Sequence, residues 1–239
     1  MENNKFIIYS AGYNCEKYIK LHMEMVQKQT YKNYKHIIVD DASTDNTYNT
    51  IKNMFDEKTI LFKSKKNLGW LHNSVQYLVP DPEDIVIVLD LDDWFFHNNV
   101  LEIINKVYNE NNCWLTYGSF IWLKENLLEG QEYPKDVIEN NKFRDSKWLA
   151  APPRTFKGLL WNKIDKSNFY IEELKDCYDQ AIMLPMLEMC PVDKMRFISD
   201  TLYVYNTYNP LLTKNIKKQE QAKAAKYIRN LPRYNKIVL

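Results

Sequence analysis

The sequence predicts an α/β fold with a mostly parallel central sheet flanked by helices, and two observations support this prediction. Short apolar runs alternate with helix-like segments four times along the first half of the chain, which is the pattern of βαβ units. The fourth run, 85–89, is apolar at every position, as expected of a strand buried on both faces of a parallel sheet. Because no linker-like stretch interrupts the chain, we expect a single domain over 1–239, with halves at 1–120 and 121–239.

Local signals define the elements of the first half. Apolar residues at helical spacing predict a helix at 16–29. The hydroxyl, carboxylate and carboxamide side chains of 42–47 predict a capped helix that ends near Phe55. A turn at 67–69 leads into a helix that ends near Leu78, before two prolines break the chain. The expected strands are 6–9, 35–39, 59–62 and 85–89.

The second half is less regular. We expect strands at 114–117, 120–123, 197–198 and 202–205, and helices at 154–164, 179–189 and 216–230. The segment 125–147 is polar with few apolar anchors, so we expect an irregular excursion that forms a lid over a site. The C-terminal helix is expected to pack on the core.

Composition narrows the class of protein. Of the 239 residues, 45% are hydrophobic and 26% charged, as in ordinary globular proteins. The formal net charge of +1 gives no reason to expect a nucleic-acid partner. The four cysteines are far apart, and no signal peptide or apolar stretch long enough for a membrane span is visible. We therefore expect a cytoplasmic protein, with the lysines at 214, 217 and 218 as the place for any peripheral contact with a membrane surface or an anionic ligand.

Three carboxylates, Asp90, Asp92 and Asp93, follow the apolar run at 85–89. Crowded carboxylates repel one another unless a cation or a proton offsets the repulsion, and ligands of open α/β sheets bind at strand ends. Oxygen ligands of this kind suit Mg²⁺ or Mn²⁺. The alternative interpretation is a solvated acidic turn that caps the helix near Val100.

Asp40 and Asp41 end the second expected strand. A carboxylate at this place can accept a hydrogen bond from a nucleotide base or ribose, although a helix cap is the simpler interpretation. No glycine-rich phosphate-binding sequence is present. A bound diphosphate would therefore need a metal ion.

Four motifs occur in a specific order and spacing: 6–9 with Tyr13-Asn14, IIVDDASTDNT at 37–47, KNLGWLHN at 66–73 and VLDLDDW at 88–94. Together they resemble the family 2 glycosyltransferases of GT-A fold, well over residues 5–100 and more loosely to about residue 210. The family's usual proline before the first Tyr-Asn is missing, and Ser10-Ala11-Gly12 stands in its place.

This resemblance implies an inverting transferase that uses a UDP-sugar donor, a divalent metal and a carbohydrate or glycoconjugate acceptor. The first half would bind the nucleotide sugar and the second half the acceptor. Asp92 would be the direct metal ligand, with Asp90 and Asp93 beside it. Asp41 would bind the base, and the further nucleotide-binding positions would be Ala11, Gly12, Tyr13, Asn67, Gly69, Asn73, Asp90 and Leu91.

Inversion needs a base that deprotonates the acceptor hydroxyl. Asp179, just before a helix-like run, is preferred, and Asp176 or Glu173 could serve instead. A helix cap is the structural alternative for Asp179. Arg154 could contact the diphosphate or acceptor, or simply pack in the core.

Three other functions fit parts of this pattern. An aspartyl phosphotransferase lacks the expected hydroxyl after its acidic motif, and a pyrophosphorylase lacks its glycine-rich N-terminal loop. A non-catalytic nucleotide-sugar-binding domain stays open.

Overall fold

The structure is a computed structural model that describes residues 3–171, 174, 177–209 and 215–238; the side chains of 215–218 are not described. The strands are β1 (Phe6–Gly12), β2 (Tyr34–Asp40), β3 (Thr59–Lys63), β4 (Ile85–Val88), β5 (Trp94–Phe95), β6 (Leu115–Trp122), β7 (Leu127–Glu129), β8 (Arg154–Lys157) and β9 (Met195–Tyr205). The helices are α1 (Glu16–Gln27), α2 (Thr47–Asn53), α3 (Gly69–Tyr77), α4 (Val100–Asn111), α5 (Lys135–Glu139), α6 (Gly158–Trp161), α7 (Tyr178–Met189) and α8 (Asn215–Asn230). Short 3₁₀ turns include η1 (Phe143–Asp145), η2 (Ser167–Tyr170) and η4 (Val192–Lys194).

The described strands form one mixed sheet in the order β3-β2-β1-β4-β8-β6-β9-β5, with β7 paired to β6. The first-half strands β3, β2, β1 and β4 are all parallel, as predicted. The second half is not: β8 runs antiparallel to both β4 and β6, while β6 and β9 are parallel. The expectation of a mostly parallel sheet is therefore corrected to a partly parallel one.

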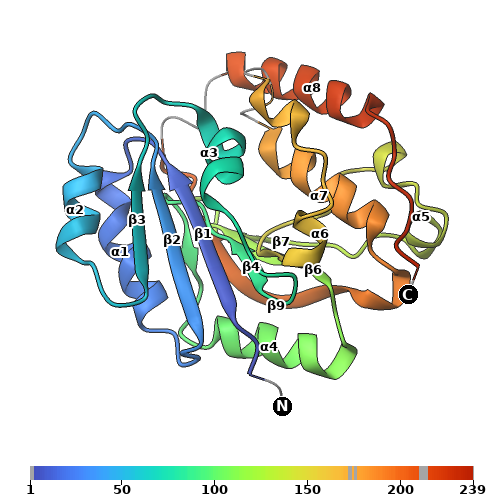
Figure 1. Ribbon diagram of the computed structural model, residues 1–239, viewed down its shortest axis with the longest axis horizontal. Coiled ribbons are helices and arrows are strands. Elements are labelled where there is room, and N and C mark those ends of the chain that lie inside the picture. Colours follow the sequence, from blue (N-terminus) through green and yellow to red (C-terminus); the bar gives the residue numbers. More distant parts are fainter. Residues whose placement is uncertain (1–2, 172–173, 175–176, 210–214, 239) are drawn as a thin grey trace.

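Side chains of the central strands alternate between two hydrophobic cores. Ile7 and Tyr9 of β1 belong to the core beneath α3, α6 and α7. Phe6 and Ile8 belong to the core beneath α4 and the end of α1. Figure 1 shows the sheet between these helices. The two-residue alternation of a strand is what allows one apolar run to serve both layers.

The ends of β1, β2 and β4 meet at one edge of the sheet. Gly12 lies beside Asp40 in the register of β1 and β2. A Cβ atom at Gly12 would lie 2.8 Å from the Cβ atom of Leu91, so only glycine allows the turn after β4 to pack this closely on β1. Three of the four predicted motifs, those at the ends of β1, β2 and β4, are thereby gathered in one place.

Several second-half elements differ from the sequence-based expectation. The segment 154–164 begins as β8 before its short helix, because Arg154–Lys157 pairs with β4 and β6. The expected strand pairs 114–123 and 197–205 are the single strands β6 and β9. Pro185 lies inside α7 without ending it.

The segment 125–147 is less open than its polarity indicated. It contains β7, α5 and η1. Tyr133, Val137, Phe143 and Arg144 are buried, so these residues anchor it to the core. The expectation of an irregular excursion is therefore corrected, because three apolar side chains spaced along a polar segment are enough to anchor short regular elements there.

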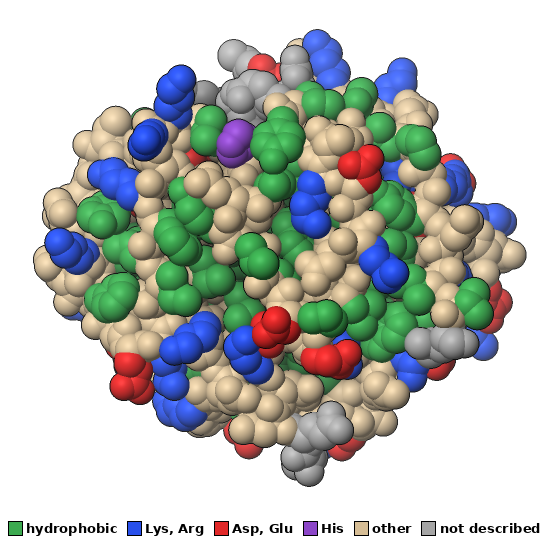
Figure 2. Space-filling model, viewed as in Figure 1, with side chains coloured by type: hydrophobic (Ala, Val, Ile, Leu, Met, Phe, Trp, Pro, Cys, Tyr) green, Lys and Arg blue, Asp and Glu red, His purple; other side chains and the backbone are tan. Residues whose placement is uncertain are grey.

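Helix α8 packs on α7, with Ala224 and Ile228 buried, as expected. Asp176 and Glu173 lie outside the described residues, as do Lys214 and the side chains of Lys217 and Lys218. Within the described part of the chain, no helix combines the length and apolar character that crossing a membrane requires. Figure 2 shows basic and acidic side chains interspersed with hydrophobic ones on one face.

Candidate active site

Asp41 follows β2 and is buried. Its Oδ1 atom accepts hydrogen bonds from the Leu68 backbone N–H at 2.9 Å and from Asn73 Nδ2 at 2.8 Å. Its Oδ2 atom accepts one from the Gly69 N–H at 2.8 Å. Gly69 has φ of 81°, a conformation that glycine adopts without strain. The carboxylate therefore holds the beginning of α3 against the end of β2.

The other predicted nucleotide-binding positions differ in exposure. Asn73 is fully buried; its Oδ1 atom accepts a 2.6 Å hydrogen bond from Ser64, and its amide donates to Asp41. Leu91 is also fully buried, which leaves only its backbone for a ligand. Gly12, Tyr13 and Gly69 are half-buried, Ala11 is buried and Asn67 is exposed.

Asp90 begins the turn after β4 and is met by a side chain from α7. The Tyr178 hydroxyl donates a 2.5 Å hydrogen bond to Asp90 Oδ2. The Tyr178 ring stacks on Trp70, with centroids 4.6 Å apart. Burial, and next the charge of Asp92, raise the pKa of the Asp90 carboxyl to about 7. Burial and the nearby charge of Asp92 thus disfavour the ionised form of Asp90.

Asp92 and Asp93 have different surroundings. Asp92 is half-buried, and its Oδ2 atom accepts a 2.7 Å hydrogen bond from Asn209. Asp93 is buried, and its two oxygens accept from the Tyr203 hydroxyl at 2.6 Å and the Asn206 N–H at 2.8 Å. Burial, followed by the charges of Asp92 and Asp90, raises the pKa of Asp93 well above its usual range. These contacts tie the turn to β9 and the residues after it.

Asp179 lies in the first turn of α7, beside Tyr178. Its Oδ2 atom accepts from Trp148 Nε1 at 3.0 Å and from the Arg154 guanidinium at 3.2 Å. Arg154 also donates to the Ala150 carbonyl and lies beside Val88 in the register of β4 and β8. The start of α7 therefore brings one side chain to the Asp90 turn and the next to Arg154.

The family comparison agrees with this geometry. Residues 10–155 match the family model described as glycosyl transferase family 2. The chain belongs to glycosyl transferase family 2.

Similar sequences and similar solved structures agree with this family assignment. The chain is 28% identical over 52% of its length, and 49% of the relative's, to the UDP-Glc:alpha-D-GlcNAc-diphosphoundecaprenol beta-1,3-glucosyltransferase WfaP of Escherichia coli. TarS of S. aureus in complex with UDP has a TM-score of 0.61 at 18% identity, covering 92% of this chain and 70% of TarS. The mannosyltransferase PcManGT of Pyrobaculum calidifontis, in complex with GDP-Man and Mn²⁺, has a TM-score of 0.60 at 15% identity, covering 96% and 66%. These structures show the GT-A fold. The chain spans 17% to 49% of the length of three curated relatives that it matches.

The acidic turn, Asp90 to Asp93, is the part of this family 2 chain that could bind a divalent cation. Asp90 and Asp92 present oxygen ligands, and Asp92 is the first Coulombic cause of the raised pKa of Asp90, which a cation would offset. Among the described residues, no three acidic, histidine or cysteine side chains gather as a metal-binding group. A cation bound by one or two carboxylates, with water and substrate phosphate as its other ligands, matches Mg²⁺ chemistry.

Sequence reasoning missed four residues that contact the acidic turn, three through a side chain and one through its backbone N–H. They are Tyr178, Tyr203, Asn206 and Asn209, each bonded through a side chain or backbone N–H to Asp90, Asp92 or Asp93. Three of these residues lie in the run LYVYNTYNP at 202–210, of which the sequence predicts only a strand at 202–205. Its repeated tyrosines and asparagines were the available signal, because such side chains pair readily with buried carboxylates.

A buried network lies beneath the acidic turn. His22 Nδ1 lies 2.8 Å from the Asp93 carbonyl, which can only accept, so Nδ1 carries a proton. Burial lowers the pKa of His22 to about 4, so the ring is neutral and Nε2 accepts. His36 Nε2 lies 3.0 Å from Ser10 Oγ, and Ser10 Oγ lies 3.4 Å from His22 Nε2. This chain of contacts links β2 and α1 to the backbone of the turn.

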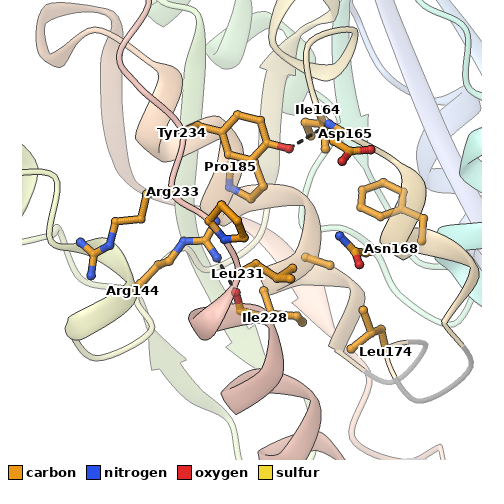
Figure 3. A pocket seen from close by; sticks show the side chains of 13 residues that line it. Arg144, Ile164, Asp165, Asn168, Leu174, Pro185, Ile228, Leu231, Arg233 and Tyr234 are labelled. Atoms are coloured by element: carbon orange, nitrogen blue, oxygen red, sulfur yellow. Dashed lines mark hydrogen bonds between the residues drawn. The ribbon is translucent and has the colours of Figure 1, made fainter.

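A cavity of about 220 Å³ lies apart from this site, between α7 and the C-terminal segment. Figure 3 shows the backbone N–H of Asp165 donating to the Tyr234 hydroxyl and Arg144 donating to the Ile228 carbonyl. None of the predicted site residues lines it. We interpret this cavity as a packing defect between α7 and the segments that pack against it.

Proposed function

We propose that this chain is a metal-dependent, inverting glycosyltransferase that moves a sugar from a UDP-sugar to a hydroxyl of a carbohydrate or glycoconjugate acceptor. We further propose that residues 1–120 bind the nucleotide sugar and that 121–239 form the acceptor side of a single domain. Asp90 and Asp92 would hold Mn²⁺ or Mg²⁺, Asp41 would bind the uracil and Asp179 would act as base.

One observation carries this proposal: two consecutive residues of α7 connect the proposed metal-binding turn to the proposed base. Tyr178 donates to Asp90, and Asp179 pairs with Arg154. Asp90 and Asp179 are also close enough for the charge of Asp179 to raise the pKa of Asp90. A metal-binding turn and a carboxylate base must share one site for transfer to occur, and the first turn of α7 supports such a site.

The uracil assignment is supported by the donor chemistry around Asp41. A carboxylate offers about four lone-pair positions, and three described hydrogen bonds use Asp41. The N3–H of uracil is a donor that the remaining position can accept. The relative named for UDP-Glc and the UDP complex of TarS agree with this choice.

Asp93 has a different proposed role from Asp92. Its oxygens accept hydrogen bonds from Tyr203 and Asn206, so we propose that it braces the turn. Asp92 then remains the direct metal ligand. When bound, the divalent cation would neutralise the developing charge on the diphosphate.

The transfer itself would be a single displacement. The acceptor oxygen forms a bond to the anomeric carbon, the bond from that carbon to the diphosphate breaks, and UDP leaves with the electron pair. Asp179 takes the hydroxyl proton. Attack opposite to the leaving group inverts the anomeric centre.

Thermal unfolding with UDP tests the donor and metal assignments. With Mn²⁺ and UDP at 100 times its dissociation constant, ligand binding adds about 2.7 kcal/mol, which raises the Tm by several degrees at this chain length. Asp92→Ala should lose most of this shift, whereas the exposed Asp200→Asn should keep it. An absence of any UDP shift in the wild type contradicts the proposal.

Donor hydrolysis separates an enzyme from a non-catalytic binding domain. UDP-glucose, UDP-galactose and UDP-N-acetylglucosamine are incubated with the chain and Mn²⁺, and released UDP is measured. A transferase should hydrolyse one of them slowly. Binding of UDP without hydrolysis or transfer of any donor would favour the non-catalytic alternative.

A further inference from the structure

A second cavity, of about 420 Å³, reaches Asp179 and Arg154. Its walls come from β6, the β6–β7 hairpin, the end of β9 and the segment before β8. The three strands lie side by side, as Figure 1 shows. The volume is within the range of small-molecule sites, about 300–1,000 Å³. The cavity is therefore large enough for a ligand that touches the proposed base.

One wall of this cavity is aromatic. Trp122 of β6 lies opposite Tyr205 of β9 in the strand register, and their ring centroids are 4.8 Å apart. Phe120 lies 5.1 Å from Trp122 on the same strand face. Phe120 is buried, while Trp122 and Tyr205 are half-buried. The strands thus hold two partly exposed rings over a buried third.

The indole N–H groups of the cavity are already bonded. Trp122 Nε1 donates to Glu129 at 2.6 Å, and Trp148 Nε1 donates to Asp179 at 3.0 Å. Both rings are thereby fixed in orientation. Rigid aromatic faces pack well against an apolar surface such as the C–H face of a pyranose ring, while hydroxyls at the ring edge meet polar groups.

The charges in the cavity balance. Glu129 and Asp179 are acidic, Lys147 and Arg154 are basic, and Arg154 pairs with Asp179. Exposed Glu129 and Lys147 remain as one acceptor and one donor for hydroxyl groups. This set favours an uncharged polyhydroxylated ligand over an anionic one.

Tyr205 connects the cavity to the acidic turn. Burial, followed by the charges of Asp93, Asp90 and Asp92, raises the pKa of the Tyr205 hydroxyl well above its usual range. Tyr205 therefore lines the cavity and also lies close enough to the three carboxylates to feel their charge.

We propose that this cavity is the acceptor subsite and that it binds an uncharged pyranose ring stacked on Trp122 and Tyr205, with the reacting hydroxyl directed at Asp179. This inference rests on the proposed function, and it specifies the acceptor as a sugar ring. The hydroxyl oxygen attacks the anomeric carbon of the donor, its proton passes to Asp179, and UDP leaves.

Ligand-observed NMR in the presence of UDP and Mn²⁺ tests the inference on the full chain. The probes are methyl glucopyranoside, methyl galactopyranoside and methyl N-acetylglucosaminide in both anomers, with methyl glucuronoside as the anionic probe and sorbitol as the open-chain probe. At least one uncharged pyranoside should bind saturably, with its C–H face in contact with aromatic protons. Binding by none of them, or only by the glucuronoside or sorbitol, overturns the inference.

Variants locate the binding surface. Trp122→Leu should weaken binding of that pyranoside at least tenfold, and Trp122→Phe should restore most of it. The UDP and Mn²⁺ thermal shift should persist in both, which separates failure of this inference from failure of the proposed function. Unaltered pyranoside binding in Trp122→Leu contradicts the inference.

Substitutions of two exposed lysines test the inference independently of whether the tryptophan variants fold. Lys147→Met should weaken pyranoside binding several-fold, because the ammonium donor is lost. Lys142→Met, at a nearby exposed position outside the cavity, should bind as the wild type does. Equal binding by these two lysine variants contradicts the proposed role of Lys147.

Discussion

Tyr178 and Asp90 are 88 positions apart in the sequence and are joined by a 2.5 Å hydrogen bond from the phenol hydroxyl to the carboxylate. This bond ties the start of α7 to the turn after β4, and Trp70 supports it by stacking on the tyrosine ring. The next residue, Asp179, is directed to Arg154. A single helix start thus couples the proposed metal site to the proposed base.

Tyr178→Phe tests this coupling. The change keeps the stacked ring but removes the donor to Asp90, and hydrogen bonds to charged groups contribute about 1.5–3 kcal/mol. We expect the free energy of unfolding of the metal-free protein to fall by that amount in urea titrations at pH 7.5. Tyr170→Phe, with its side chain exposed, is the matched control, and equal stability of the two variants would show that the Tyr178 hydroxyl contributes nothing.

A buried ion pair supports α7 from its other side. Arg144 of η1 contacts both carboxylate oxygens of Glu188, and the Tyr234 N–H also donates to Glu188. Both side chains of the ion pair are buried, so removing one partner leaves an uncompensated charge, which costs about 3–5 kcal/mol. We expect Arg144→Met to lower the free energy of unfolding by that amount.

The double variant Arg144→Met/Glu188→Leu is the control for this ion pair. It removes both charges together, so its stability should exceed that of Arg144→Met alone. Denaturant unfolding of both variants measures the difference. A double variant that is less stable than the single one would mean that the pair stabilises the fold beyond charge compensation.

Acid should destabilise the fold through His36. Burial, together with nearby His22, holds the pKa of His36 well below its usual value of 6.5. Because the unfolded chain takes up this proton more readily, the contribution to stability is complete above about pH 6.5 and falls as the pH drops, by up to about 1.4 kcal/mol per pH unit. The other titratable side chain in contact with it is His22.

Urea unfolding between pH 7.5 and 5.5 measures this effect as a slope. His36→Asn should show a shallower loss of stability with falling pH than the wild type, whatever its stability at pH 7.5. His72→Asn, which replaces a half-buried histidine, should keep the wild-type slope. A slope unchanged in His36→Asn would contradict the buried neutral histidine.

Much of the first half was predictable from the sequence because its signals are local. The uniform apolar run before Asp90 indicated a doubly buried strand, and β4 is buried at every position. Asp41 and the acidic turn were each predicted to follow a strand of the parallel part of the sheet, where ligands bind at strand ends. The GT-A fold, expected from the motifs, is confirmed by the solved structures.

The partners of the acidic turn could not be predicted because they come from distant segments. Tyr203 meets Asp93 across 110 positions, and Asn209 meets Asp92 across 117. The tyrosines and asparagines of 202–210 mark residues able to pair with carboxylates, but no local pattern states which aspartate each one meets. Arg154 was expected in a helix, whereas pairing with β4 and β6 imposes a strand there, which is a case of tertiary context overriding local propensity.

The central claim is that Asp179 is the base of a metal-dependent transfer, and Asp179→Asn tests it most directly. The amide keeps an oxygen for Trp148 and Arg154 but cannot take the acceptor proton. With the donor that the wild type hydrolyses or transfers, the account predicts a fall in rate of about 10²–10⁴-fold, with the UDP and Mn²⁺ thermal shift retained. Asp193→Asn, whose carboxylate side chain is 73% exposed, should react at the wild-type rate. An Asp179→Asn rate within a few-fold of the wild type would contradict the account.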